Sequence, residues 1–176
     1  MKLKRVTWLR FTVGMMVFIP LMGLLIALQV GWLKNYQVTS SSMKPTLMIG
    51  DRVIMDSVGK DYQPERGEVI IFISPDRQDE LLAKRVIGIS GDLIQIKNGF
   101  LFLNGEEQVE MYRSMENAKI NVEDTTVIVE PDEVFVLGDN RNFSFDSLNF
   151  GGVAMWRIQG KLKMIYWPAH RMGGIH

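Results

Sequence analysis

Short apolar runs rich in Val, Ile and Phe, each bounded by turn residues, are the feature that most constrains the fold of this chain. Asn98-Gly99 separates two of them, and Asn-Gly is a strong hairpin signal because both central residues of the tight turn need positive φ. The pattern predicts a mainly β domain. The expected strands lie at 52–55, 68–73, 81–89, 93–97, 100–103, 125–129, 134–137 and 161–167.

A second feature is the run from Phe11 to Leu33, which is 23 residues long and carries no charge. About 20 apolar residues cross the hydrocarbon core of a bilayer, so the run predicts a single transmembrane helix, with a buried core helix as the weaker alternative. The run ends in Gln29-Val30-Gly31-Trp32-Leu33, which is a poor cleavage site, and this favours an uncleaved signal anchor over a signal peptide.

Charge gives the expected orientation. Four basic residues precede the apolar run, at positions 2, 4, 5 and 10, and they predict a cytoplasmic N-terminus. We therefore expect a single-pass protein of the plasma membrane, with the lipid bilayer as a partner and the β domain outside the cytoplasm. The expected parts are 1–10, a basic segment; 11–33, the anchor; 34–105, the first part of the β domain; 106–133, an inserted cap or subdomain; and 134–176, the second part of the β domain.

Composition excludes several function classes. The chain has no cysteine, which rules out disulfides, thiolate nucleophiles and cysteine zinc sites. Of its 20 basic residues four precede Phe11, so the remaining 16 stand against 20 acidic residues and give that part a formal charge of −4. This balance argues against a surface for nucleic acid.

Ser40-Ser41-Ser42 follows the apolar run, and three serines in a row usually form a solvated linker. Here Pro45 restricts the backbone just after Ser42, and Met43 and Leu47 add apolar bulk beside the hydroxyl. Such a serine can be partly desolvated and can act as a nucleophile if the chain supplies a base.

The base cannot easily be a histidine, because His170 and His176 lie after Pro168 in a tail that we expect to be frayed. Lys84 is the only lysine within a long apolar β-run, and desolvation there can lower its pKa by several units. Lys84 and Arg85 point to opposite faces of a strand, so we expect one inside and the other in water, with an exposed strand edge as the alternative.

Four ordered segments resemble the successive motifs of bacterial type I signal peptidases. They are Ser42-Met43-Lys44-Pro45-Thr46-Leu47, Gly50-Asp51, the segment 84–92 that begins Lys84-Arg85, and the segment 138–147 that begins Gly138-Asp139-Asn140. The resemblance implies a β-rich signal-peptidase-type catalytic domain with a small inserted subdomain, and an endopeptidase that removes signal peptides from secretory preproteins through an acyl-enzyme. It implies no metal and no organic cofactor.

The resemblance also assigns roles to individual residues. Ser42 would be the nucleophile and Lys84 the general base. The Ser42 N–H and the Ser40 hydroxyl would form the oxyanion hole. Ser144 would orient the lysine amine, with Asp146 and Asn140 in support. Four positions depart from the family pattern: Ser41, Ser90, Ala154 and Leu148, the last standing where an arginine commonly partners the residue matching Asp146.

The substrate is expected to bind as an added strand beside 36–41 and 81–83. Small apolar pockets near Val38, Met43, Leu47, Leu82 and Ala83 would select small side chains at the first and third positions before the cut. Two alternatives remain open: a Ser/Lys self-cleaving protease of the SOS-repressor type, and an anchored β domain that binds peptides without cutting them.

Overall fold

The computed structural model describes residues 12–23, 26, 33–77, 80–113, 119–121 and 123–175. The chain divides into two units, residues 1–34 and residues 35–176. Each unit is described separately below.

The first unit contains the uncharged N-terminal run. Residues 12–23 and residue 26 are helical. Among the described residues, none of the helices combines the length and the apolar character that crossing a membrane requires. The prediction of an N-terminal transmembrane helix over 11–33 is therefore wrong for the residues described, and 1–11, 24–25 and 27–32 lie outside them.

The second unit confirms the mainly β prediction, and each expected strand is present. Its elements are β1 (Leu33–Gln37), β2 (Arg52–Ser57), β3 (Val69–Ile73), β4 (Leu81–Ile89), β5 (Leu93–Lys97), β6 (Phe100–Leu103), β7 (Glu106–Glu107), β8 (Thr125–Ile128), β9 (Glu133–Leu137), η2 (Arg141–Phe143), α2 (Ser147–Phe150), β10 (Val153–Ala154), η3 (Met155–Arg157), β11 (Ile158–Trp167), η4 (Ala169–Arg171) and β12 (Gly173–Gly174).

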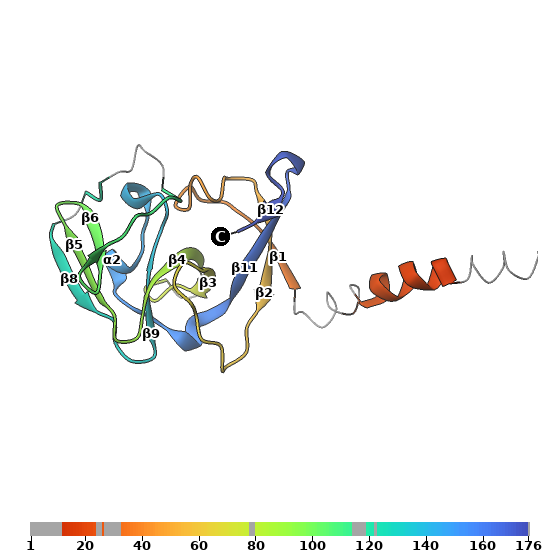
Figure 1. The fold of residues 1–176 in the computed structure, drawn as a ribbon, viewed down its shortest axis with the longest axis horizontal. Coiled ribbons are helices and arrows are strands. Elements are labelled where there is room, and N and C mark those ends of the chain that lie inside the picture. The colour runs from red at the N-terminus through yellow and green to blue at the C-terminus, as the bar shows by residue number, and fades with distance from the viewer. Residues whose placement is uncertain are drawn as a thin grey trace, which may run out of the picture. The chain divides into compact units, whose positions relative to one another are not determined.

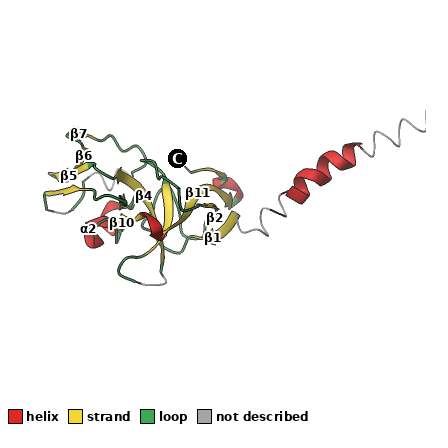
Figure 2. Ribbon diagram, turned by 90° about the horizontal axis from the view of Figure 1, so that it is seen from below, coloured by secondary structure: helices red, strands yellow, loops and turns green. Residues whose placement is uncertain are grey.

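The strands form two sheets. Within the described ranges the larger has eight strands in the order β1-β2-β11-β3-β4-β9-β10, with β12 paired to β11, and the smaller has four in the order β7-β6-β5-β8. Figure 1 shows the smaller sheet at one end of the domain, with β9 and β4 between it and β11, and Figure 2 shows β5, β6 and β7 together at that end. The nine-residue strand β4 is thus central, with β3 and β9 as antiparallel neighbours.

The Asn98-Gly99 hairpin is present as predicted. Both residues have positive φ, 52° and 81°, and Lys97 pairs with Phe100 across the turn. The smaller sheet takes β5 and β6 from the expected first part of the domain and β7 and β8 from the expected insertion at 106–133. The five-part division itself stays a prediction.

One buried hydrophobic cluster fixes the turn that carries the serines. Met43 and Leu47 on this turn pack in the same cluster as Val53, Ile71 and Leu162 from β2, β3 and β11. Because these strands belong to the larger sheet, the turn is anchored to that sheet.

The C-terminal tail is not frayed, contrary to our expectation. The guanidinium of Arg171 donates to Asp51 at 3.0 Å and to the Thr46 carbonyl at 3.0 Å, and β12 pairs with β11. The tail therefore supports the serine turn. His170 is exposed, and His176 lies outside the described residues.

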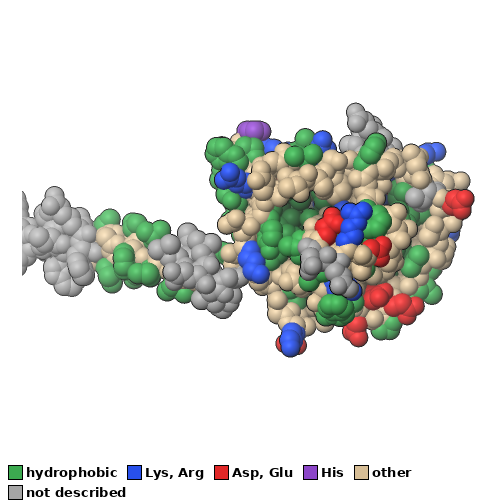
Figure 3. All heavy atoms as spheres, turned by 180° about the vertical axis from the view of Figure 1, so that it is seen from behind, with side chains coloured by type: hydrophobic (Ala, Val, Ile, Leu, Met, Phe, Trp, Pro, Cys, Tyr) green, Lys and Arg blue, Asp and Glu red, His purple; other side chains and the backbone are tan. Residues whose placement is uncertain are grey.

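The surface mixes charges of both signs. On the face drawn in Figure 3, basic and acidic side chains are interspersed among hydrophobic ones.

Candidate active site

Ser42 lies in the turn that follows β1, and its side chain is largely shielded from solvent, with 8% of the residue exposed. The turn closes on itself through the Leu47 N–H, which donates to the Met43 carbonyl at 2.8 Å. Asn140 ties the same turn to the end of β9: its backbone N–H donates to the Ser42 carbonyl and its side-chain amide to the Ser41 carbonyl, both at 3.0 Å. The nucleophile candidate thus sits on a backbone held from two sides.

The structure brings Ser42 and Lys84 together across 42 positions of sequence. Lys84 Nζ donates to Ser42 Oγ at 2.7 Å, and only 2% of Lys84 is exposed. The Ser40 hydroxyl lies 3.1 Å from Ser42 Oγ, within hydrogen-bond reach. Three residues expected in the centre therefore form one hydrogen-bonded group.

Burial lowers the pKa of Lys84 to about 8, because the interior disfavours the charged amine. The carboxylates of Asp146, Glu80 and Asp139 act in the opposite direction and raise it, but their effect is smaller than that of burial. A lysine of this kind is neutral in a substantial fraction of molecules near pH 8. A neutral amine that faces a serine hydroxyl can accept its proton.

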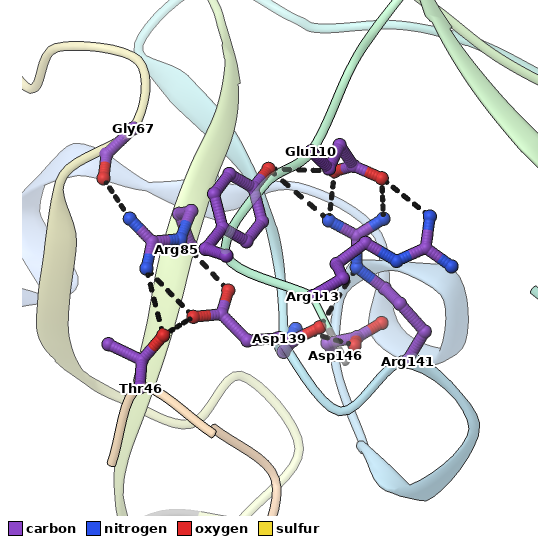
Figure 4. A network of polar contacts seen from close by, with 10 residues as sticks. Thr46, Gly67, Arg85, Glu110, Arg113, Asp139, Arg141 and Asp146 are labelled. Carbon is purple, nitrogen blue, oxygen red and sulfur yellow. Dashed lines mark hydrogen bonds and ion pairs between the residues drawn. The ribbon is translucent and has the colours of Figure 1, made fainter. Parts of the chain in front are cut away.

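Arg85, the next residue on β4, corrects the expectation that one of the two cations faces water. Arg85 is 1% exposed and Asp139 is fully buried. Arg85 Nε and Nη2 donate to the two oxygens of the Asp139 carboxylate at 2.9 Å and 2.7 Å, a bidentate geometry (Figure 4). The Thr46 hydroxyl donates to the same carboxylate at 2.5 Å, and the Gly67 carbonyl accepts from Arg85 at 2.7 Å. The buried charge is therefore fully compensated.

Ser144 is not joined to Lys84 as the resemblance implied. Among the described residues its hydroxyl is buried without a hydrogen-bond partner. It packs against Gly138, where an added Cβ would stand 2.3 Å from Ser144 Oγ and 2.5 Å from the Ser42 carbonyl oxygen. The hydroxyl thus lies beside the nucleophile's own backbone, and any side chain at Gly138 would displace both.

The Asp146 side chain binds backbone N–H groups. Its carboxylate accepts from the Gly138 N–H at 3.0 Å and from the Leu148 N–H at 3.2 Å, and it forms a capping box with Asn149 at the start of α2. Where the family pattern has an arginine side chain, this chain therefore offers the backbone N–H of Leu148.

A small pocket of about 100 Å³ adjoins the serine. About 10 to 15 Å³ on this measure holds one water molecule, so the pocket has room for a small side chain. All five residues proposed from sequence to bind substrate are among those that line it: Val38, Met43, Leu47, Leu82 and Ala83. Ser40 and Ser42 also line it, so the nucleophile candidate borders this space.

Two sets of functional candidates were not found from sequence. The first is the pair Arg85 and Asp139, although an arginine within an apolar strand requires a carboxylate partner and was itself a signal. The second is the pair Glu110 and Arg141, whose pairing no pattern in the sequence indicates. Among the described residues there is no group of three or more His, Cys, Asp or Glu side chains that could hold a metal ion.

Comparison with known proteins gives consistent matches. The family model described as "Signal peptidase, peptidase S26" matches residues 8–167. The chain is 38% identical over 146 residues to signal peptidase I of Bacillus caldolyticus, an alignment that covers 76% of this chain and 79% of that protein. It is 36% identical over 142 residues to probable signal peptidase I-2 of Synechocystis sp., covering 77% of this chain and 64% of that protein. A crystal structure of a signal peptidase I from Enterococcus faecalis V583 is similar with a TM-score of 0.50 and 30% identity, covering 57% of this chain and 97% of that one.

Proposed function

The chain belongs to the signal peptidase family, peptidase S26, and from this premise we propose that Ser42 and Lys84 are its catalytic dyad. Its activity is that of a signal peptidase I, a serine endopeptidase. The observation that carries the proposed dyad is the 2.7 Å hydrogen bond between Lys84 Nζ and Ser42 Oγ. The lowered pKa of Lys84, about 8, supports the same assignment because a base must be able to exist without its proton.

In the acylation step, Ser42 Oγ attacks the scissile carbonyl carbon while its proton moves to Lys84 Nζ. The carbonyl oxygen becomes an oxyanion, which accepts hydrogen bonds from the Ser42 N–H and the Ser40 hydroxyl. Removing one such donor from a serine protease typically costs about 3 to 4 kcal/mol of transition-state stabilisation. The C–N bond then breaks, Lys84 returns the proton to the leaving amine, and the substrate's acyl group stays on Ser42.

In the deacylation step, a water molecule replaces the leaving amine. Lys84 Nζ, neutral again, takes a proton from this water, whose oxygen attacks the ester carbon. Collapse of the second tetrahedral intermediate breaks the bond to Ser42 Oγ, which recovers its proton from Lys84. No other group is needed to balance the reaction.

The substrates in this proposal are exported preproteins that carry signal peptides. The volume of the pocket, about 100 Å³, favours small side chains next to the scissile bond, and Val38, Leu82 and Ala83 supply its apolar contacts. The substrate backbone would pair with 36–41 and 81–83. Residues 36–40 and 81–83 line the pocket.

The substrate class also supports a proposal for location. Preproteins reach a signal peptidase as they leave the cytoplasm, so the β domain would act at the outer face of the plasma membrane. Contact of the chain with the lipid bilayer stays a prediction.

The test is to mix the purified full chain with a preprotein and to identify new N-termini by mass spectrometry, with Ser42→Ala as the matched control. We expect one new N-terminus after a small-x-small sequence with the unchanged chain and none with the control. Binding without a new N-terminus would support the peptide-binding alternative, and equal cleavage by Ser42→Ala would refute the dyad.

A further inference from the structure

Glu110 lies outside the proposed dyad, in the segment that follows β7 of the smaller sheet, yet only 4% of its side chain is exposed. Its carboxylate accepts hydrogen bonds from three side chains. Arg113 Nη1 and Tyr112 Oη both donate at 2.7 Å, and Arg141 binds both oxygens, with Nη1 at 2.8 Å (Figure 4). A buried carboxylate with this many donors is fixed in one orientation.

Arg141 links Glu110 to Gly138, at the start of the segment 138–147. Its side chain is fully buried, and its Nε donates to the Gly138 carbonyl at 2.9 Å. Gly138 is the residue against which both the Ser144 hydroxyl and the Ser42 carbonyl pack. The backbone at Gly138 is therefore held by Arg141 on one side while it shapes the surroundings of the nucleophile on the other.

Tyr112 gives a second chain of contacts, from Glu110 to the neighbour of the proposed base. Its ring covers the guanidinium of Arg85, whose carbon lies 4.1 Å from the ring centroid. Arg85 in turn holds Asp139 and directly follows Lys84 on β4. Both chains of contacts begin at Glu110. One ends at Gly138, against which the Ser42 carbonyl packs, and the other ends at Arg85, the neighbour of the proposed base.

We infer that Glu110 is a positioning residue for the dyad: it fixes Arg141 and Tyr112, and through them the backbone of Gly138 and the side chain of Arg85. The inference rests on the proposed function, since it assigns Glu110 a part in that reaction. The positioning role also accounts for a buried carboxylate that does not line the pocket. Burial would raise the pKa of Glu110, but the charge of Arg141 and the hydrogen bonds hold it below its usual value, so the carboxylate stays ionised and balances the buried guanidinium.

The test compares Glu110→Gln with Glu107→Gln, a matched control whose side chain is exposed on β7 in the same segment. Misplacing catalytic groups by about 1 Å can cost about 100-fold in rate, so for Glu110→Gln we expect kcat to fall at least about tenfold. KM should stay within about twofold, because Glu110 does not line the pocket. A kcat equal to that of Glu107→Gln would overturn the inference, as would a loss that appears only in KM.

Tyr112→Phe keeps the test valid if Glu110→Gln does not fold. This variant keeps the ring over Arg85 and loses only the hydroxyl, which donates to Glu110 and accepts from Arg141 Nη2 at 3.4 Å. We expect kcat to fall about threefold with KM unchanged, and a kcat equal to wild type would contradict the proposal.

Amide hydrogen exchange separates this inference from the proposed function. The Asn140 N–H donates to the Ser42 carbonyl, so a displaced Gly138 should speed its exchange in Glu110→Gln but not in Glu107→Gln. Equal exchange in the two variants would overturn the positioning role of Glu110. Failure of the wild-type chain to cleave a preprotein would refute only the proposed function. The two failures can therefore be told apart.

Discussion

Lys84 and Arg85 are neighbours on β4, and both are buried basic residues. Their side chains have opposite kinds of partner. Arg85 is bound by a carboxylate, a hydroxyl and a carbonyl. The amine of Lys84 meets the hydroxyl of Ser42, and no carboxylate forms an ion pair with it among the described residues. Arginine cannot lose its proton in a protein, whereas lysine can when it is desolvated.

The difference explains how one strand supplies both rigidity and a base. A paired charge keeps its full charge and anchors what surrounds it, so Arg85 holds Asp139 and Thr46 beside the serine turn. An unpaired amine in the same interior is pushed toward its neutral form, which is the form that can take a proton. The chemistry at Lys84 therefore depends on its lack of the partner that Arg85 has.

The largest expected effect comes from Lys84→Met, which removes the amine and keeps an unbranched side chain of similar length. Cleavage should fall by about 10⁴-fold, because the serine has lost its base. The variant should melt no lower than wild type at pH 7, since a desolvated charge has also gone. Preprotein cleavage and a thermal melt check both parts, and substantial remaining activity would contradict the dyad.

The same substitution at the next residue, Arg85→Met, should lower stability. This substitution leaves Asp139 buried without its counter-ion. The free energy of unfolding, measured by chemical denaturation, should therefore fall by about 3 to 5 kcal/mol. Replacing the partner as well, in Arg85→Met with Asp139→Leu, should recover most of the loss. A loss below about 1 kcal/mol in the single variant would mean that the pair does not anchor the strand.

Ser144→Ala probes a buried hydroxyl that has no partner among the described residues. Removing it should change the free energy of unfolding by less than about 0.5 kcal/mol, because no hydrogen bond is lost. If the hydroxyl orients the Lys84 amine during the reaction, kcat should fall about tenfold. Steady-state kinetics measure this, and an unchanged kcat would remove Ser144 from the mechanism.

The smallest expected effect is a shift in pH dependence. Cleavage at low substrate should rise with pH through about 8 as Lys84 loses its proton. The charge of Asp146 raises the pKa of Lys84, so Asp146→Asn, which can still cap α2, should move this rise to lower pH. Asp61→Asn, at an exposed position, is the control. A shift to higher pH would contradict the assigned sign.

The sequence was sufficient for what depends on local pattern. Alternation and β-branched residues predicted the strands, and Asn98-Gly99 predicted a hairpin whose positive φ values the structure contains. Lys84 stood out because a lysine within an apolar run is unusual, and the structure places its amine 2.7 Å from the Ser42 hydroxyl.

What the sequence did not give depends on long-range contacts. Whether Arg85 faces the interior or water was left open, because its partner Asp139 lies 54 residues away. The tail was expected to be loose because nothing near Arg171 indicates Asp51, which lies 120 residues earlier. The transmembrane helix was predicted from a long uncharged run, and none of the helices among the described residues has the length and apolar character to cross a membrane. For Arg85 and for the tail, the missing information is which distant group compensates a charge.

Titration of the Lys84 amine by nitrogen NMR, with lysine labelled in the side chain and the resonance identified by its loss in Lys84→Met, tests the central claim most directly. Burial without a paired carboxylate predicts a pKa of about 8. A pKa at or above about 10.4, the value of a solvated lysine, would contradict the claim that Lys84 is held ready as a neutral base.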